Sequence, residues 1–378
     1  MTGSQSEGKL RERTCLLTGG AGFIGCALTR RIADRFDRLI VVDALHPQVH
    51  VEPVRPKDLD STAIFYHADI TDPGVWHRIL DRYSPDVVVH LAAETGTAQS
   101  LTEATRHAHV NVVGTTCMLD AFAKSGKIPS RIVLTSSRAV YGEGPWQHVK
   151  EGKTIYPAQR SKAQLERGEW DFPEMRPQPV EAGKTTPMPV SVYGATKLAQ
   201  EHILMCWSVS FGVKAVILRL QNVYGPGQSL NNVYTGIVSL FVQLAREGKS
   251  IPIYEDGNIV RDLIFIDDVA DVLTLACLAD FPSEIPYDIG SGRSTKLLDL
   301  ANMIATRYGS PLPIVSGKFQ HGDVRHASCK LRRSTELLTW SPQWSLEQGL
   351  TALMAWVEKS SEAGRPMYER VVQGSLED

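Results

Sequence analysis

The chain carries the stretch TCLLTGGAGFIG at residues 14–25. A short apolar run leads directly into glycines at positions 19, 22 and 25. The spacing suits a strand that turns tightly into a helix: Gly19 permits the turn, Gly22 lets backbone approach a pyrophosphate, and Gly25 lets the helix pack close to the strand. The start of that helix would present free N–H groups to phosphate. Because the glycines follow a predicted strand and open a predicted helix, they indicate a dinucleotide-binding site.

The second predicted strand favours NAD over NADP. It ends in Asp43, where a carboxylate can accept hydrogen bonds from both hydroxyls of an adenosine ribose and would repel a 2′-phosphate. Arg35 and Arg38 precede this strand and are less well placed to pair with such a phosphate. The alternative is an aspartate that only caps the following turn.

The first two-thirds of the chain alternates short apolar runs with segments of helical length. Most runs are continuous in Val, Ile and Leu, which is typical of strands covered on both faces. This alternation predicts an α/β fold with a Rossmann-like, doubly wound parallel sheet. Strands are expected at residues 15–18, 39–43, 64–67, 87–91, 132–136 and 215–220, and early helices at 23–35 and 75–83.

The sequence predicts two domains. Residues 1–220 form the cofactor-binding domain, and residues 221–378 form a smaller lobe that partly interleaves with the sheet. An insertion at 143–190, rich in Pro, Gly, Lys, Glu and Gln, is expected over one edge of the site, with a short helix near 163–168. In the smaller lobe, helices are expected near residues 235–247, 268–279, 296–308 and 346–359.

Composition excludes several classes of protein. The 378 residues carry a formal net charge of −2, which indicates neither a nucleic-acid nor a membrane partner. Residues 1–13 are polar and unlike a signal peptide, and no apolar run reaches the roughly 18 residues that span a membrane. The six cysteines form no Cys-x-x-Cys pair, so we expect reduced thiols and no metal. A cytoplasmic location is predicted.

A catalytic group is predicted from the sequence YGATK at residues 193–197. Tyr193 and Lys197 share one helix face, and a nearby ammonium together with a positive nicotinamide ring would bring the phenol toward ionisation at neutral pH. Ser137 follows the strand 132–136, whose carboxyl end should face the ligand crevice. Its hydroxyl could bridge Tyr193 and a substrate oxygen. The alternatives are a solvated helix face and a serine that forms a turn.

Several ordered motifs resemble the NAD-dependent sugar epimerase/dehydratase family, the extended short-chain dehydrogenases. The likeness runs from residue 14 to about 356 and includes HLAA at 90–93, NVVGT at 111–115, Tyr193-x-x-x-Lys197 and RLQNVYGPG at 219–227. The resemblance implies NAD in the first lobe and a nucleotide-diphosphate sugar between the lobes.

The resemblance also implies a set of binding residues. The cofactor residues are Gly19, Gly22, Phe23, Ile24, Gly25, Asp43, Asp69, Ile70, Leu91, Ala92, Ala93, Asn111, Tyr193 and Lys197, of which Asp69 and Ile70 would touch the adenine. The substrate residues are Glu94, Thr95, Ser137, Arg138, Asn222, Gln228, Arg261 and Arg325, with the last two clamping a diphosphate.

The residues after Ser137 narrow the choice among the reactions that the family catalyses. Family dehydratases have an Asp-Glu pair there and decarboxylases a Glu two residues on, whereas this chain has Arg138 and Ala139. The strings at 136–144 and 220–230 resemble bacterial dTDP-L-rhamnose 4-epimerases, which implies inversion of C4 of dTDP-L-rhamnose to dTDP-6-deoxy-L-talose. The chain departs from the family pattern at Gln320 and Lys330, where the family often has Arg and Asp.

Other functions stay open at this point. They are an epimerase for another nucleotide sugar or another carbon, a reductase of a keto sugar, and a dinucleotide sensor without catalysis. The family also implies a homodimer that pairs through a four-helix bundle, formed by the helix near 102–124 and the helix that begins at Tyr193.

Overall fold

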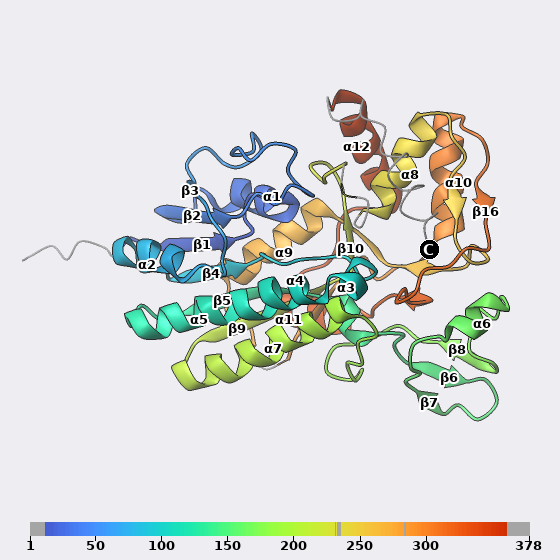
Figure 1. Cartoon of the computed structure of the whole chain (residues 1–378), viewed down its shortest axis with the longest axis horizontal. Coiled ribbons are helices and arrows are strands. Elements are labelled where there is room, and N and C mark those ends of the chain that lie inside the picture. The colour runs from blue at the N-terminus through green and yellow to red at the C-terminus, as the bar shows by residue number, and fades with distance from the viewer. Residues whose placement is uncertain (1–11, 231, 233–235, 283–284, 361–378) are drawn as a thin grey trace, which may run out of the picture.

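A computed structural model describes residues 12–230, 232, 236–282 and 285–360. Its centre is a seven-stranded sheet in the order β14-β9-β5-β4-β1-β2-β3, with every neighbouring pair parallel (Figure 1). The strands are β1 (Thr14–Thr18), β2 (Arg38–Asp43), β3 (Ile64–His67), β4 (Val87–His90), β5 (Arg131–Ser137), β9 (Lys214–Leu220) and β14 (Tyr287–Ile289). The predicted α/β fold is confirmed, and the six predicted strands agree with the observed ones to within one residue at each end.

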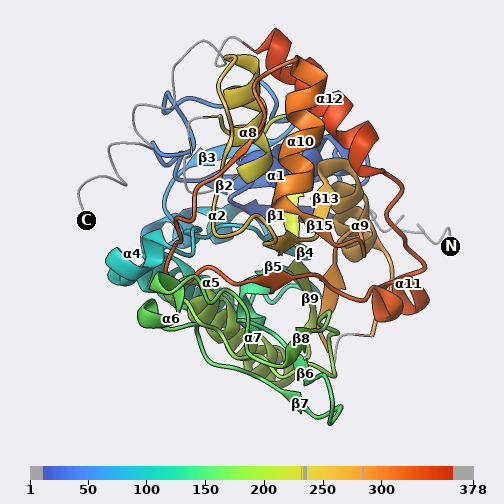
Figure 2. The same ribbon diagram turned by 90° about the vertical axis from the view of Figure 1, so that its right-hand side faces the viewer.

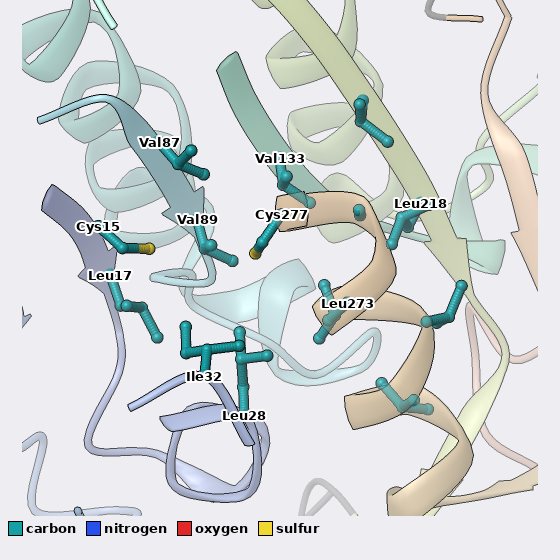
Figure 3. Packing of buried hydrophobic residues seen from close by; sticks show 14 of the residues in the cluster. Cys15, Leu17, Leu28, Ile32, Val87, Val89, Val133, Leu218, Leu273 and Cys277 are labelled. Carbon is teal, nitrogen blue, oxygen red and sulfur yellow. The ribbon is translucent and has the colours of Figure 1, made fainter. Parts of the chain in front are cut away.

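Helices cover both faces of this sheet, because successive side chains of a strand point to opposite sides. In β1, Leu17 packs toward α1 (Phe23–Ile32) and α9 (Ile266–Leu278), in the cluster that Figure 3 shows. The neighbouring Leu16 packs toward α2 (Pro73–Arg82), α5 (Gly114–Ser125) and α7 (Val192–Phe211). Continuous apolar runs such as that of β1 are therefore explained by two cores on either side of one sheet.

The strand order places a crevice where β1 and β4 lie side by side. From β1 the chain proceeds to β2 and β3 in one direction, whereas β4, β5 and β9 extend in the other. Ligands of open α/β sheets bind outside the carboxyl ends of the strands at such a reversal. Gly19 has a φ of +66°, and a Cβ there would lie 2.6 Å from the backbone nitrogen of Ala92. The loops that follow β1 and β4 therefore touch at the crevice.

A smaller layer of helices lies beyond the carboxyl ends of the strands (Figures 1 and 2). It consists of α8 (Ile237–Arg246), α10 (Leu297–Tyr308) and α12 (Leu346–Lys359), which share one apolar core, with the strand pair β11 (Pro252–Ile253) and β16 (Ile314–Val315). Between these elements, α9 and β14 return to the large sheet. The second part of the sequence thus contributes to both cores. The short strands β10 (Asn222–Tyr224), β12 (Val260–Arg261), β13 (Leu263–Phe265), β15 (Thr295–Lys296) and β17 (His326–Ala327), and the helix α11 (Arg332–Leu338), connect them.

The insertion folds as a small antiparallel sheet with one helix. Its elements are β6 (Trp146–His148), β7 (Thr154–Ile155), β8 (Met175–Pro177) and α6 (Lys162–Glu166). The predicted helix is present, but the sequence did not predict the strands because each is too short to show a period. Arg160 fastens the insertion to the smaller layer: its guanidinium contacts Glu143 at 3.2 Å and Glu255 at 2.9 Å, and all three side chains are buried.

The helix expected near 102–124 is interrupted. The structure has α3 (Gln99–Thr102), a break at Glu103, α4 (Ala104–Ala108), a π-helical turn (His109–Val113) and then α5. All six cysteines are free, although Cys206 is exposed rather than buried. Among the described residues, no helix is long and apolar enough to cross a membrane. Residues 1–11 and Thr235, which entered the sequence predictions, lie outside the described part.

A buried histidine makes the stability of this fold depend on pH. His90, at the end of β4, contacts Thr18 at 2.6 Å and Thr115 at 2.9 Å, and burial lowers its pKa to about 3. In the unfolded chain a histidine binds a proton near pH 6.5, so below that pH the unfolded state binds the additional proton. We expect the free energy of unfolding to fall by up to about 1.4 kcal/mol per pH unit from pH 6.5 downward.

Urea denaturation at pH 7, 6 and 5 measures this slope. His90→Asn should flatten it, whereas His77→Asn, at an exposed position, should not. An unchanged slope in the His90 variant would rule out this histidine as its source.

Candidate active site

Asp43 lies at the tip of β2, directly beside the glycine turn. Its Oδ2 accepts a hydrogen bond from the backbone nitrogen of Ala21 at 3.0 Å, and its Oδ1 accepts one from that of Leu45 at 2.9 Å. The carboxylate therefore caps the following turn, as the alternative reading held, and also braces the loop that would hold a dinucleotide. Each oxygen retains a lone pair that can accept from a ribose hydroxyl.

The glycines at 22 and 25 meet different surroundings. A Cβ on Gly25 would lie 2.4 Å from the carbonyl oxygen of Gly20, so this glycine is required by close packing of α1. A Cβ on Gly22 would have one neighbour within 4 Å, the carbonyl oxygen of Gly19 at 3.4 Å. No side chain caps α1, and no acidic residue lies in its first turn. The open space in front of uncapped N–H groups fits the diphosphate of a dinucleotide.

Asn111 fastens the loop after β4 to α7. Its amide nitrogen donates to the carbonyl of Glu94 at 3.0 Å and to the hydroxyl of Thr196 at 2.9 Å, and its oxygen accepts from the nitrogen of Glu94 at 2.8 Å. The residue is fully buried. The amide of Asn111 thus positions the loop and α7, while its predicted contact with the cofactor stays a prediction.

The catalytic candidates come together where α7 begins beside β5. Ser191 caps α7 by accepting from the backbone nitrogen of Gly194 at 3.0 Å. A Cβ on Gly194 would lie 2.5 Å from the carbonyl oxygen of Ala139, so glycine is what allows α7 to approach the turn after β5 this closely. The hydroxyl of Ser137 consequently hydrogen-bonds to the phenol of Tyr193. Ser137 Oγ also accepts from the nitrogen of Ala139 at 3.1 Å, which leaves its proton for the phenol oxygen.

The charges that act on Tyr193 differ from those predicted. Burial raises the pKa of its phenol, while the hydrogen bond from Ser137 and the positive charge of Arg138 oppose that rise. The cation that lowers the pKa of the phenol in this arrangement is Arg138, and the contribution of Lys197 stays a prediction. Burial lowers the pKa of Lys197 to about 8, and Glu201 opposes that change. No described side chain lies within hydrogen-bond distance of the ammonium, which can therefore bind a ribose.

Glu201 lies one helical turn after Lys197 and was missed by the sequence analysis. Its carboxylate binds Arg219 through two hydrogen bonds of 2.9 and 2.6 Å and also accepts one from the hydroxyl of Ser136. It thereby joins the ends of β5 and β9 to α7. The four-residue repeat of Tyr193, Lys197 and Glu201 on one helix face was the available indication.

Arg138, Asn222 and Arg261 lie together beside Tyr193. The Nε of Arg138 donates to the side-chain oxygen of Asn222 at 3.0 Å. Burial and the nearby positive charge of Arg261 lower the pKa of Arg138 to about 10. Arg261 itself pairs with Asp323 at 2.5 Å. Two adjacent guanidinium groups in a buried place would be stabilised by an anion.

Comparison with known proteins identifies the family. The sequence matches the NAD dependent epimerase/dehydratase family over residues 15–167 and 169–290. The chain belongs to this family. NAD is accordingly its cofactor, and the open glycine turn, Asp43 and the unpartnered Lys197 fit that molecule.

Relatives with assigned activities include epimerases and dehydratases. A dTDP-L-rhamnose 4-epimerase of Burkholderia thailandensis is 57% identical over 343 residues, which are 90% of this chain and 94% of that protein. A dTDP-glucose 4,6-dehydratase of Salmonella typhimurium is 29% identical over 90% of this chain and 91% of its own. The structure of UDP-glucose 4-epimerase from Thermotoga maritima with UDP-glucose has a TM-score of 0.76 at 28% identity, covering 92% of this chain and 99% of that one.

Some residues expected from the family pattern are engaged elsewhere. Every side-chain nitrogen of Arg325 donates to a carboxylate of Asp171, Glu255 or Asp256 at 2.7 to 3.3 Å. All N–H donors of this guanidinium are therefore used in the described arrangement, and the expected diphosphate contact of Arg325 stays a prediction.

Other predicted contacts are also used inside the protein. Gln228 is buried, and its amide binds the carbonyl of Val223 at 3.4 Å and the hydroxyl of Ser239 at 2.9 Å. The carboxylate of Glu94 pairs with Arg106 at 3.3 Å, and the carbonyl of Thr95 contacts His107 at 3.3 Å. Phe23, Ile24, Leu91, Ala92 and Ala93 are partly exposed around the glycine turn, whereas Asp69 is exposed and Ile70 buried beside it. These residues lie around the glycine turn, but the structure does not itself assign them a ligand.

Alanine substitutions of Gly22 and Gly25 should have separate effects, one on cofactor binding and the other on folding. Gly25→Ala should destabilise the protein, because its methyl group would collide with the backbone of Gly20. Gly22→Ala should fold with a near-normal melting temperature but bind NAD more weakly, since the methyl group would occupy the space in front of α1. Thermal unfolding and NAD titration measure the two effects. Equal NAD affinity of wild type and Gly22→Ala would contradict the assigned place of the diphosphate.

Proposed function

We propose that the protein is an NAD-dependent 4-epimerase that interconverts dTDP-L-rhamnose and dTDP-6-deoxy-L-talose through a 4-keto sugar. The observation that carries the proposal is the 57% identity to a dTDP-L-rhamnose 4-epimerase, which extends over nearly the full length of both proteins. The residues after Ser137 support it. Arg138 and Ala139 offer no carboxylate for elimination, which disfavours the dehydratase reaction of the more distant relatives.

The reaction begins with removal of a proton from the sugar 4-hydroxyl by the phenolate of Tyr193. The hydrogen bond from Ser137 and the charge of Arg138 stabilise the phenolate against the effect of burial. NAD, when bound, would supply the hydride acceptor and donor for C4, and Lys197 would hold its nicotinamide ribose. After the keto sugar has turned about its diphosphate linkage, the opposite face of C4 would meet the hydride, and Tyr193 would return the proton to the 4-oxygen.

The nucleotide diphosphate must stay anchored while the sugar turns. We assign this role to Asn222, Arg138 and Arg261, which lie together beside Tyr193. A phosphate oxygen would replace Asp323 on Arg261 and would relieve the repulsion between the two guanidinium groups. Glu94 and Thr95 form the adjoining wall, and Arg325 and Gln228 support it through their internal contacts. The substrate would thus lie between the Rossmann domain of residues 1–220 and the lobe of residues 221–378.

A homodimer through α5 and α7 is part of this proposal. The two helices run side by side on one outer face of the sheet (Figure 1). Val113, Val209 and Phe211 are exposed there, to 40%, 86% and 43%. Analytical ultracentrifugation should give about twice the chain mass of 41.7 kDa, and Val209→Lys should shift the population toward monomer. A wild-type monomer at micromolar concentration would contradict this pairing.

Turnover of dTDP-L-rhamnose tests the function directly. The purified protein, with no added reductant, should convert part of it to the 4-epimer, with the C4 proton followed by NMR beside parallel samples of other dTDP-, UDP- and GDP-sugars. Dependence on stoichiometric NADH would instead establish a keto-sugar reductase. Absence of any turnover across the panel would favour a dinucleotide sensor.

Tyr193→Phe should separate chemistry from binding. The variant should fold and bind NAD, but kcat should fall about 10² to 10⁴-fold, the usual contribution of a positioned acid/base. Tyr83→Phe, at the end of α2 and remote from the site, is the matched control and should keep full activity. Near-normal turnover of Tyr193→Phe would falsify the assignment of the phenol.

A further inference from the structure

A small polar cavity lies behind the substrate-facing side chain of Arg138. Its volume is about 10 Å³ for the centre of a water-sized group, which is room for one such group and not for a sugar ring. It is lined by Arg138, Tyr141, Gly142, Val180, Gln221, His326, Ala327 and Ser328. These residues come from the turn after β5, the insertion, the loop after β9, and β17 with the residue that follows it.

Gln221 brings an unpaired amide to this cavity. The residue is 4% exposed, and neither its side-chain nitrogen nor its oxygen has a nitrogen or oxygen partner among the described residues. The Cys329 thiol, which donates its own proton to Asp262 at 3.6 Å, offers the amide only a weak sulfur acceptor. A buried polar group without a partner costs about 1 to 3 kcal/mol. Such a cost at a position next to Asn222 calls for a ligand.

Ser328 adds a second unpaired group to the same wall. It is 3% exposed, and its hydroxyl has no partner among the described residues. Its backbone is firmly held, since its carbonyl accepts from the nitrogen of Val180 at 2.9 Å. Two separate segments therefore each bring an unsatisfied side chain to the lining of one cavity.

The polar groups that await a partner here are neutral. An amide offers one donor group and one acceptor, and a serine hydroxyl offers both, so together they match a hydroxyl group better than an anion. His326 also lines the cavity and stays neutral above its pKa of about 4, which burial and the charges of Arg261 and Arg325 lower. Arg138, the charged residue of the lining, already donates a hydrogen bond from its Nε to Asn222 and lies beside Tyr193.

We infer that Gln221 and Ser328 form a subsite that takes a single hydroxyl group of the substrate's sugar, next to the reacting carbon. The inference rests on the proposed function, because it places the sugar ring over Arg138. It goes beyond that proposal by naming two residues that would discriminate among sugars. A site built to hydrogen-bond a hydroxyl rejects an analogue that lacks it, because its buried polar groups are then left unpaired.

Binding by the NAD-loaded protein tests the subsite. Calorimetry in a Tyr193→Phe background, which prevents turnover, compares dTDP-L-rhamnose with bare dTDP. Gln221→Leu and Ser328→Ala should each weaken binding of the sugar nucleotide roughly 5- to 100-fold and leave that of dTDP unchanged. A set of dTDP-L-rhamnose analogues, each lacking one ring hydroxyl, identifies the group that is bound. The analogue without that hydroxyl should bind with equal affinity to the Tyr193→Phe protein and to the same protein carrying Gln221→Leu.

Two controls distinguish this role from a structural one. Ser208→Ala removes another buried, unpaired hydroxyl, on α7 and away from the cavity, and should change neither affinity. Without ligand, Gln221→Leu should melt at the same or a higher temperature, since it removes an unpaired amide. An equal loss for both ligands, or no loss for either, overturns the subsite.

Failure of the proposed function gives a different result. If the wild type does not epimerise dTDP-L-rhamnose, calorimetry uses another pair of ligands in place of dTDP-L-rhamnose and dTDP. The pair is the sugar nucleotide of the panel that binds most tightly and the same nucleotide without its sugar. An unchanged affinity ratio in Gln221→Leu, or a panel in which no sugar nucleotide binds more tightly than its bare nucleotide, then overturns the subsite as well.

Discussion

The buried carboxylate of Glu201 holds the active site together. It binds Arg219 on β9 and Ser136 on β5 while belonging to α7 itself. Ser136 precedes Ser137, and Lys197 lies one turn before Glu201, so one carboxylate fixes the distance between the serine and the helix that carries Tyr193. Losing one partner of a buried pair leaves the other charge uncompensated, at a cost of about 3 to 5 kcal/mol. The catalytic geometry therefore depends on the same contact that joins the helix to the sheet.

The cofactor side of the site depends on steric limits rather than on charge pairs. Gly19 allows the turn to touch the loop after β4, and Gly25 allows α1 to pack on the same turn. Asp43 then fixes the turn through the backbone nitrogen of Ala21. The cofactor side of the site is thus formed mainly by close backbone contacts where the strand order reverses. Few of its side chains would act on a ligand.

The sequence allowed the large sheet and the meeting of Ser137 with Tyr193 to be predicted, for a common reason. Strands such as β5 are continuous apolar runs, and Ser137, Tyr193 and Lys197 occur at positions that the alternation of strands and helices places at one edge. The short strands of the insertion carry no such pattern. Nor does a sequence say which partner a polar side chain will choose: Asn111 and Arg325 were expected to bind ligands but are bonded within the protein. The charge that favours the Tyr193 phenolate comes from Arg138, which only tertiary packing reveals.

The late position of β14 has a consequence during synthesis on the ribosome. β14 covers the outer edge of β9, yet about 70 residues separate the two strands, so that edge stays open for roughly 4 to 14 s at ordinary elongation rates. An open edge strand can pair with another nascent chain. Truncated or stalled products that end before residue 287 would therefore expose a ready template for aggregation, and chaperone capture would matter most in that interval.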